Sequence, residues 1–113
     1  QVLDQLTTPR WSQYTFSMAA TLLLKERHVL ADNAFVELVV WRLPEIPKGS
    51  IHFFKYWLAL IVDRECVLRY DNEIGKGDHK HIGNEEHEYR FVSAEKLIDD
   101  FWQDVDDWRD RNG

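Results

Sequence analysis

The sequence has little cysteine and no long apolar run. Cys66 is the one cysteine among 113 residues, so the chain can form no internal disulfide and no zinc site built from four cysteines. No apolar stretch approaches the roughly 18 residues of a membrane-spanning helix, and the opening residues lack the basic and then apolar pattern of a signal peptide. We therefore expect a protein of the reducing cytoplasm without a membrane partner.

Positive charge is also scarce. The chain carries 14 basic and 20 acidic residues, which gives a formal net charge of −6. Residues 93–113 hold most of this excess, because 7 acids minus 3 bases leave a net charge of −4 there. Proteins that bind nucleic acid by bulk charge carry the opposite excess. The balance therefore counts against RNA or DNA held by charge alone.

Proline and glycine are few, at three and five residues, and the apolar content of 44% is enough for a globular core. The length suits one domain over residues 1–113. Pro9 interrupts any helix near the start, so we expect residues 1–16 to form a loosely ordered arm. Five Trp, six Phe and four Tyr indicate a core or groove built from aromatic rings.

Two hairpins are predicted before residue 73. Residues 34–43 are β-branched and aromatic and predict a strand. Residues 18–27 include good helix formers, but the turn dipeptide Asp32-Asn33 favours a strand over roughly residues 22–30. Residues 51–62 and 66–72 predict a second hairpin around a turn at Asp63 and Arg64. Residues 75–88 predict a polar loop, with a short extra strand at 89–91.

The last segment has the pattern of an amphipathic helix over residues 93–110. Ser93 is a good N-cap. Apolar residues then recur at spacings of one, three and four along one stripe: Leu97, Ile98, Phe101, Trp102, Val105 and Trp108. The stripe must be buried against the sheet. We therefore predict an α+β fold, with an antiparallel sheet of about four strands and this helix packed on one face.

The register of the second hairpin predicts which side chains share a face. A two-residue turn at Asp63 and Arg64 pairs Trp57 with Tyr70, and the alternation along each strand then separates apolar from polar side chains. The apolar face, predicted to lie under the helix, would hold Trp57, Ala59, Ile61, Cys66, Leu68 and Tyr70. The other face would gather His52, Tyr56, Arg69 and Asp71. The same residues also fit simpler roles, because Arg69 and Asp71 suit a surface ion pair and His52 suits a solvated strand start.

The segment from residue 66 to 82 turns from an apolar strand into a run of ionisable residues, which is typical of a functional loop beside a rigid strand. Its ionisable members are Arg69, Asp71, Glu73, Lys76, Asp78, His79, Lys80 and His81. The two histidines could exchange protons near neutral pH, either with each other or with His52. Arg69 and Lys76 could hold a phosphate, and Asp71 or Glu73 could orient a histidine.

A metal site is the weaker interpretation of the same residues. In extended backbone His79 and His81 would face one side and could chelate a divalent metal, but a lone His-x-His on a loop is more often solvated. The sequence indicates no cofactor. Gly75-Lys76-Gly77 lacks the spacing of a P-loop, and no nucleophile elbow is present.

Taken together, these residues resemble the TumE family of bacterial type II toxins. The resemblance runs from about Leu24 to Val105. It is carried by His52 and Tyr56, the block from Arg69 to His81, the triplet Tyr89-Arg90-Phe91, and the helix around Leu97 and Phe101. It implies a small cytoplasmic toxin encoded beside an antitoxin that is typically a helix-turn-helix protein. One departure is Arg64, which stands where the family usually has glycine in the second hairpin turn.

Two functions remain open on this basis. The first is an endoribonuclease, with the two histidines, Arg69 and Lys76 acting on the RNA backbone, since many small toxins of such modules are ribonucleases. The second is a non-enzymatic interaction protein whose polar block braces a partner-binding loop, and the net charge of −6 favours it. The sequence does not indicate an oligomeric state.

Overall fold

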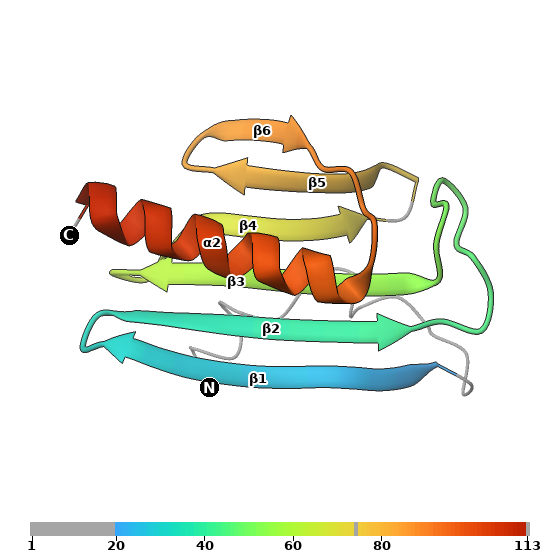
Figure 1. Ribbon diagram of the computed structural model, residues 1–113, viewed down its shortest axis with the longest axis horizontal. Coiled ribbons are helices and arrows are strands. Elements are labelled where there is room, and N and C mark those ends of the chain that lie inside the picture. Colours follow the sequence, from blue (N-terminus) through green and yellow to red (C-terminus); the bar gives the residue numbers. More distant parts are fainter. Residues whose placement is uncertain (1–19, 74, 113) are drawn as a thin grey trace.

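The computed structural model describes residues 20–73 and 75–112, which form one antiparallel sheet and one helix (Figure 1). The strands are β1 (Thr21–Ala31), β2 (Ala34–Arg42), β3 (Phe54–Val62), β4 (Glu65–Glu73), β5 (Gly77–Ile82) and β6 (Glu85–Glu88), and the helix is α2 (Ala94–Asn112). The strand order in the sheet is the order in the chain. The α+β prediction is confirmed, although the sheet has six strands where about four were expected.

Both predicted hairpins are present. Asp32 and Asn33 form the two-residue turn between β1 and β2. Asp63 and Arg64 have φ angles of 52° and 69°, as required by the turn that suits the twist of a two-residue hairpin. Glycine adopts such angles without strain, so Arg64 occupies a position that favours glycine. The predicted arm over residues 1–16 lies outside the described residues.

The prediction of a polar loop over residues 75–88 is wrong, because the structure has a third hairpin there, formed by β5 and β6. β5 pairs with β4 along its whole length, and β6 pairs with β5. Gly83 supplies the positive φ angle, 60°, at the turn between them. Charged residues have low intrinsic strand propensity, but strand formation depends mainly on cross-strand neighbours. The short extra strand predicted at residues 89–91 is not a strand in the structure.

The predicted register of the second hairpin holds only next to its turn. Ile61 pairs with Cys66 as expected, but the pairing shifts by one residue between Leu60 and Ile61. Beyond this bulge Trp57 pairs with Asp71 and Leu58 pairs with Tyr70. A shift of one residue moves every following side chain to the opposite face. The predicted faces of β3 are therefore wrong, whereas Leu68 and Tyr70 of β4 lie under the helix as predicted. Cys66 is exposed rather than in the core.

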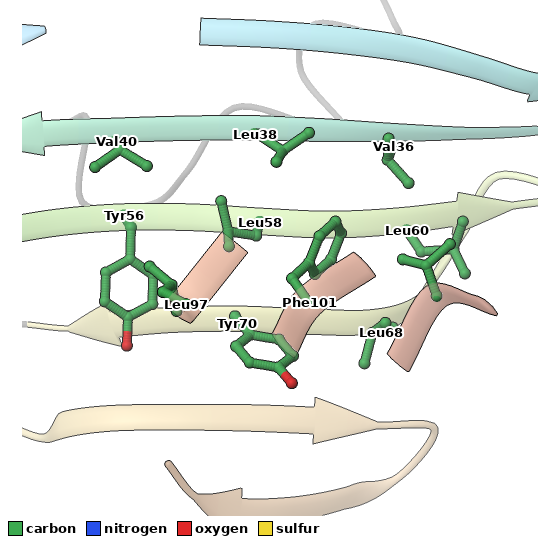
Figure 2. Close-up of a cluster of buried hydrophobic side chains, with 11 residues drawn as sticks. Val36, Leu38, Val40, Tyr56, Leu58, Leu60, Leu68, Tyr70, Leu97 and Phe101 are labelled. Carbon is green, nitrogen blue, oxygen red and sulfur yellow. The ribbon is translucent and has the colours of Figure 1, made fainter. Parts of the chain in front are cut away.

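The main core lies between α2 and the sheet. Leu97, Phe101 and Val105 are the buried residues of the helix, and they pack on side chains of β2, β3 and β4. Figure 2 shows this cluster, which contains Val36, Leu38, Val40, Tyr56, Leu58, Leu60, Leu68 and Tyr70 beside the helix residues. The amphipathic stripe is thus confirmed. Ser93 caps the helix by accepting a hydrogen bond from the Lys96 amide at 3.1 Å.

A smaller cluster lies on the face of the sheet that points away from α2, here called the second face. It consists of Phe35, Val39, Trp57, Ala59 and Ile61, with Trp41 packed against them. The face that packs on α2 is called the helix side. Within the described chain, no helix is long and apolar enough to cross a bilayer.

Candidate functional site

The pairing of β4 with β5 brings four of the predicted site residues together on the second face. Arg69 pairs with His81, and Asp71 pairs with His79. Residues directly opposite each other on neighbouring strands share a face. Glu86 joins them from β6, where it pairs with His81. We call Arg69, Asp71, His79, His81 and Glu86 the second-face cluster.

Arg69 is held on one side and open on the other. Its Nε lies 3.1 Å from Asp71 Oδ2, and the contact is an ion pair without the geometry of a hydrogen bond. Its guanidinium lies 5.5 Å from the ring centroid of Trp57. Nε is buried without a hydrogen-bond partner among the described residues. The side chain is 30% exposed, so its outer nitrogens can reach a ligand.

The two histidines of β5 flank one carboxylate. His79 Nε2 lies 2.7 Å from the carbonyl oxygen of Lys76, and because a carbonyl can only accept, this nitrogen carries a proton. The other ring nitrogen, Nδ1, lies 3.5 Å from Glu86 Oε2. His81 Nε2 lies 3.7 Å from the same oxygen. Sequence reasoning missed Glu86, because a predicted loop offers no strand pairing that would reveal it.

Burial sets the electrostatics of the cluster. It raises the pKa of Asp71, which is 5% exposed, and the Arg69 and His81 charges oppose that rise. Burial also lowers the pKa of His81, and the Arg69 charge lowers it further. Both effects follow from the cost of charge in a low-dielectric site. Both effects favour the neutral imidazole of His81, the form that a proton acceptor needs.

A buried lysine supports this site from β3. Lys55 is 1% exposed, and its Nζ donates to the main-chain oxygen of Asn72. Burial lowers its pKa from 10.5 to about 8, although the Asp71 and Glu73 charges pull the other way. The Asn72 side chain accepts from the Tyr56 amide at 3.0 Å and donates to the Phe54 carbonyl at 2.7 Å. It thereby replaces the main-chain pairing where the β3–β4 ladder ends, which the sequence did not predict.

The glycines beside Lys76 have a structural explanation. Gly75 and Gly77 have φ angles of 86° and 80°, which favour glycine. A Cβ added to Gly49 would lie 2.8 Å from Gly75 Cα, so the preceding loop packs directly on this turn. Lys76 is exposed at the turn. The alternation of β4 places Glu73 on the second face with Asp71.

His52 lies on the helix side, so its predicted place beside Arg69 is wrong. Its Nδ1 accepts from the Phe54 amide at 3.1 Å, which leaves Nε2 to carry the proton. Nε2 donates to the Asp78 carboxylate at 2.9 Å. Both ring nitrogens are occupied and the residue is 8% exposed. His52 therefore offers no free nitrogen for proton exchange, and the one-residue bulge in the β3–β4 pairing explains the error.

The comparisons with known proteins decide the family. A family model described as Toxin TumE matches residues 19–109. The chain belongs to the TumE toxin family. No curated protein and no solved structure matches the chain.

The match to the TumE family covers the whole second-face cluster and also His52, Lys55 and Tyr56. Within the described part of the chain, no group of three or more His, Cys, Asp or Glu side chains is arranged to hold a metal ion. The cluster nevertheless combines a neutral imidazole, a second histidine and an open guanidinium. These are the groups that proton transfer at a phosphate requires.

Proposed function

We propose that this TumE toxin is the toxin of a toxin–antitoxin pair and that it cleaves RNA with the second-face cluster. The observation that carries the proposal is the pairing of Arg69 with His81 and of Asp71 with His79. This pairing gathers two imidazoles and a guanidinium on one face. Membership of a toxin family supports the biological role.

In the proposed reaction His81 takes the proton of a ribose 2′-hydroxyl, whose oxygen attacks the adjacent phosphorus and forms a P–O bond. The bond from phosphorus to the 5′ oxygen breaks, and His79, in its doubly protonated form, gives the Nδ1 proton to that oxygen and keeps the Nε2 proton. The products are a 2′,3′-cyclic phosphate and a 5′-hydroxyl. Arg69 stabilises the charge on the phosphate oxygens, and Lys76 adds a second cation from the turn.

The carboxylates of the cluster have supporting roles in this proposal. Asp71 holds Arg69 through the 3.1 Å ion pair. Glu86 lies between the two imidazoles and can orient both rings. The net charge of −6 means that affinity for RNA must come from local contacts and not from the overall field.

The proposal is tested by incubating the purified protein with cellular RNA and mapping the ends of any fragments. We expect cleavage that leaves 2′,3′-cyclic phosphate ends and falls about 100-fold or more in His79→Ala and His81→Ala. His87→Ala is the matched control, because His87 is an exposed histidine of β6 whose ring nitrogen contacts Glu85 outside the cluster. It should retain full activity.

A growth assay and a chelator, used beside the cleavage assay, separate the alternatives. A toxin that arrests growth but cleaves no RNA, and whose toxicity survives alanine at His79, His81 and Lys76 together, would act as a non-enzymatic interaction protein. Cleavage that stops on addition of a chelator would instead indicate a metal-dependent hydrolase.

A cognate antitoxin, expected to be a helix-turn-helix protein encoded beside the toxin, is part of the proposal. Because the proposed chemistry needs an open Arg69, an antitoxin that covers the second face would neutralise the toxin by occlusion. A complex in which Arg69 and His79 stay open to solvent would require another mode of neutralisation.

A further inference from the structure

A buried polar network lies on the helix side of the sheet, directly behind the second-face cluster. The Asp78 carboxylate accepts a hydrogen bond from the Tyr56 hydroxyl at 2.6 Å and from His52 Nε2 at 2.9 Å. Phe91 stacks on the His52 ring with the centroids 3.8 Å apart. Tyr56 is fully buried, and the side chains of His52 and Asp78 are about nine-tenths buried. Burying such groups costs free energy that an apolar core would not cost.

The network ends on the residue that precedes His79. Asp78 and His79 are consecutive in β5, so their side chains point to opposite faces. The main-chain oxygen of Asp78 also accepts a hydrogen bond from the Tyr89 amide at 3.1 Å. Asp78 is thus fixed by β3, by the loop before β3 and by the segment after β6. Gly77, immediately before it, has no side chain that could restrain the turn.

We propose that Tyr56 and His52 are positioning residues that act through Asp78 to hold His79 in place. A side chain fixed at two points on one face of a strand limits the rotation of the next residue on the other face. His79 is then held so that Nε2 meets the Lys76 carbonyl at 2.7 Å and Nδ1 faces Glu86. Burial and the Asp78 charge both raise the pKa of Tyr56, so its hydroxyl remains a donor. This inference rests on the proposed role of His79.

Tyr70→Phe is the matched control for Tyr56→Phe. Tyr70 is also buried on the helix side, and its hydroxyl also donates to a carboxylate, that of Asp104 in α2. Each substitution removes one buried hydroxyl and its hydrogen bond to an acid. The Tyr56 hydroxyl donates directly to Asp78, the residue before His79, whereas Tyr70 meets Lys80, the residue after His79, through its ring, which phenylalanine retains. A general loss of stability therefore affects both variants, and the loss of a hydrogen bond to a neighbour of His79 affects one.

The direct test is the state of the His79 ring, followed by ¹⁵N and ¹³C NMR of histidine side chains in the folded proteins. We expect the neutral form of the His79 ring, which remains after it has donated the Nδ1 proton, to carry its proton on Nε2 in wild type and Tyr70→Phe. Tyr56→Phe should show an average of the two tautomers, while His81 keeps its wild-type signals. An unchanged His79 tautomer in folded Tyr56→Phe would overturn the proposal whatever the protein does to RNA.

A second pair of variants keeps the test decisive if Tyr56→Phe does not fold. His52→Ala removes the second donor to Asp78, whereas His52→Gln retains an N–H that can replace it. We expect the His79 tautomer to be averaged in His52→Ala and restored in His52→Gln. The same His79 tautomer state in both His52 variants would contradict the proposed positioning role of His52.

RNA cleavage provides an independent measurement on the same proteins. Small displacements of a catalytic group lower kcat by about 10- to 100-fold, so Tyr56→Phe should lose activity on that scale with KM within about twofold, and Tyr70→Phe should not. If neither the wild type nor any variant cleaves RNA, the proposed function fails. The NMR comparison still decides whether Tyr56 and His52 position His79.

Discussion

The two faces of the sheet around β4 and β5 carry similar residue types in very different hydrogen-bonding states. On the helix side, His52 uses both ring nitrogens, and the Asp78 carboxylate accepts from two side chains. On the second face, Arg69 has a buried Nε without a hydrogen-bond partner among the described residues and an exposed outer end. The contrast separates residues that complete the fold from residues that keep capacity for a ligand.

The difference has an energetic meaning. A fully satisfied buried network rigidifies its surroundings, and His52 with Asp78 fits that role. A buried donor without a hydrogen-bond partner costs about 1–3 kcal/mol, and at Arg69 the ion pair with Asp71 and the contact with the Trp57 ring are set against that cost. Sites that do chemistry are where such costs are retained. Residue type alone, which made His52 and His79 equal candidates, does not distinguish these situations.

The largest expected effect is a loss of stability, which should be greater for a substitution on the helix side than for one on the second face. Phe101 is fully buried between α2 and the sheet, so Phe101→Ala should lower the free energy of unfolding by about 3–5 kcal/mol. Arg69→Ala, on the second face, should lower it by less, because the Arg69 side chain is 30% exposed, although the substitution leaves the buried Asp71 carboxylate without its ion-pair partner. Urea unfolding measures both values. Equal losses would remove the distinction between the faces.

Asp71→Asn should act in the opposite direction on stability. Burial raises the pKa of Asp71 above the ordinary 3.8, so the folded protein binds that proton more tightly than the unfolded chain does. Stability therefore falls as pH rises past 3.8 toward the folded pKa and stays lower above it. The neutral variant avoids this penalty.

We expect Asp71→Asn to be more stable than wild type at pH 7 by about 0.5–2 kcal/mol, the range typical of such site substitutions, and to have lost RNA cleavage. The gain should shrink to nothing below pH 3.8. Thermal unfolding over a pH series measures it. A variant that is less stable than wild type at pH 7 would show that Asp71 serves the fold.

Local sequence signals predicted the elements whose causes are local. The Asp32-Asn33 turn, the primed turn at Asp63 and Arg64 and the Ser93 cap each depend on a few adjacent residues, and all three are present. The stripe of α2 was equally predictable because a helix repeats its burial pattern along one segment.

The features that sequence reasoning missed depend on distant residues. The bulge between Leu60 and Ile61 shifts the register by one residue, and no residue type in β3 or β4 marks it. β5 and β6 are strands because they pair with β4 and with each other, although their composition is that of a loop. Lys55 lies in an apolar strand pattern, and its buried contact with Asn72 depends on where the β3–β4 ladder ends.

The smallest effect concerns the exposed face of α2, where a charged contact should matter little. Lys96 Nζ contacts both Asp100 oxygens at 2.9 Å. Burial alone would raise the pKa of Asp100, but hydrogen bonds from Tyr89 and Lys96 outweigh it and lower the pKa. The carboxylate therefore contributes stability above the ordinary 3.8, and this contribution is lost as pH falls through the lower, folded value.

Lys96→Ala should cost about 0.3–0.5 kcal/mol at pH 7, as for other pairs at this helix spacing, and this cost should disappear in acid and shrink in high salt. The order of the pair, with the base nearer the N-terminus, is the less favourable one, so a value at the low end is expected. Gln103→Ala is the control, because Gln103 donates to Asp107 at 3.1 Å with the same spacing and a neutral donor. Urea unfolding at low and high salt should separate the two variants. If Lys96→Ala lowered the free energy of unfolding as much as Phe101→Ala does, the exposed face of α2 would also contribute substantially to stability.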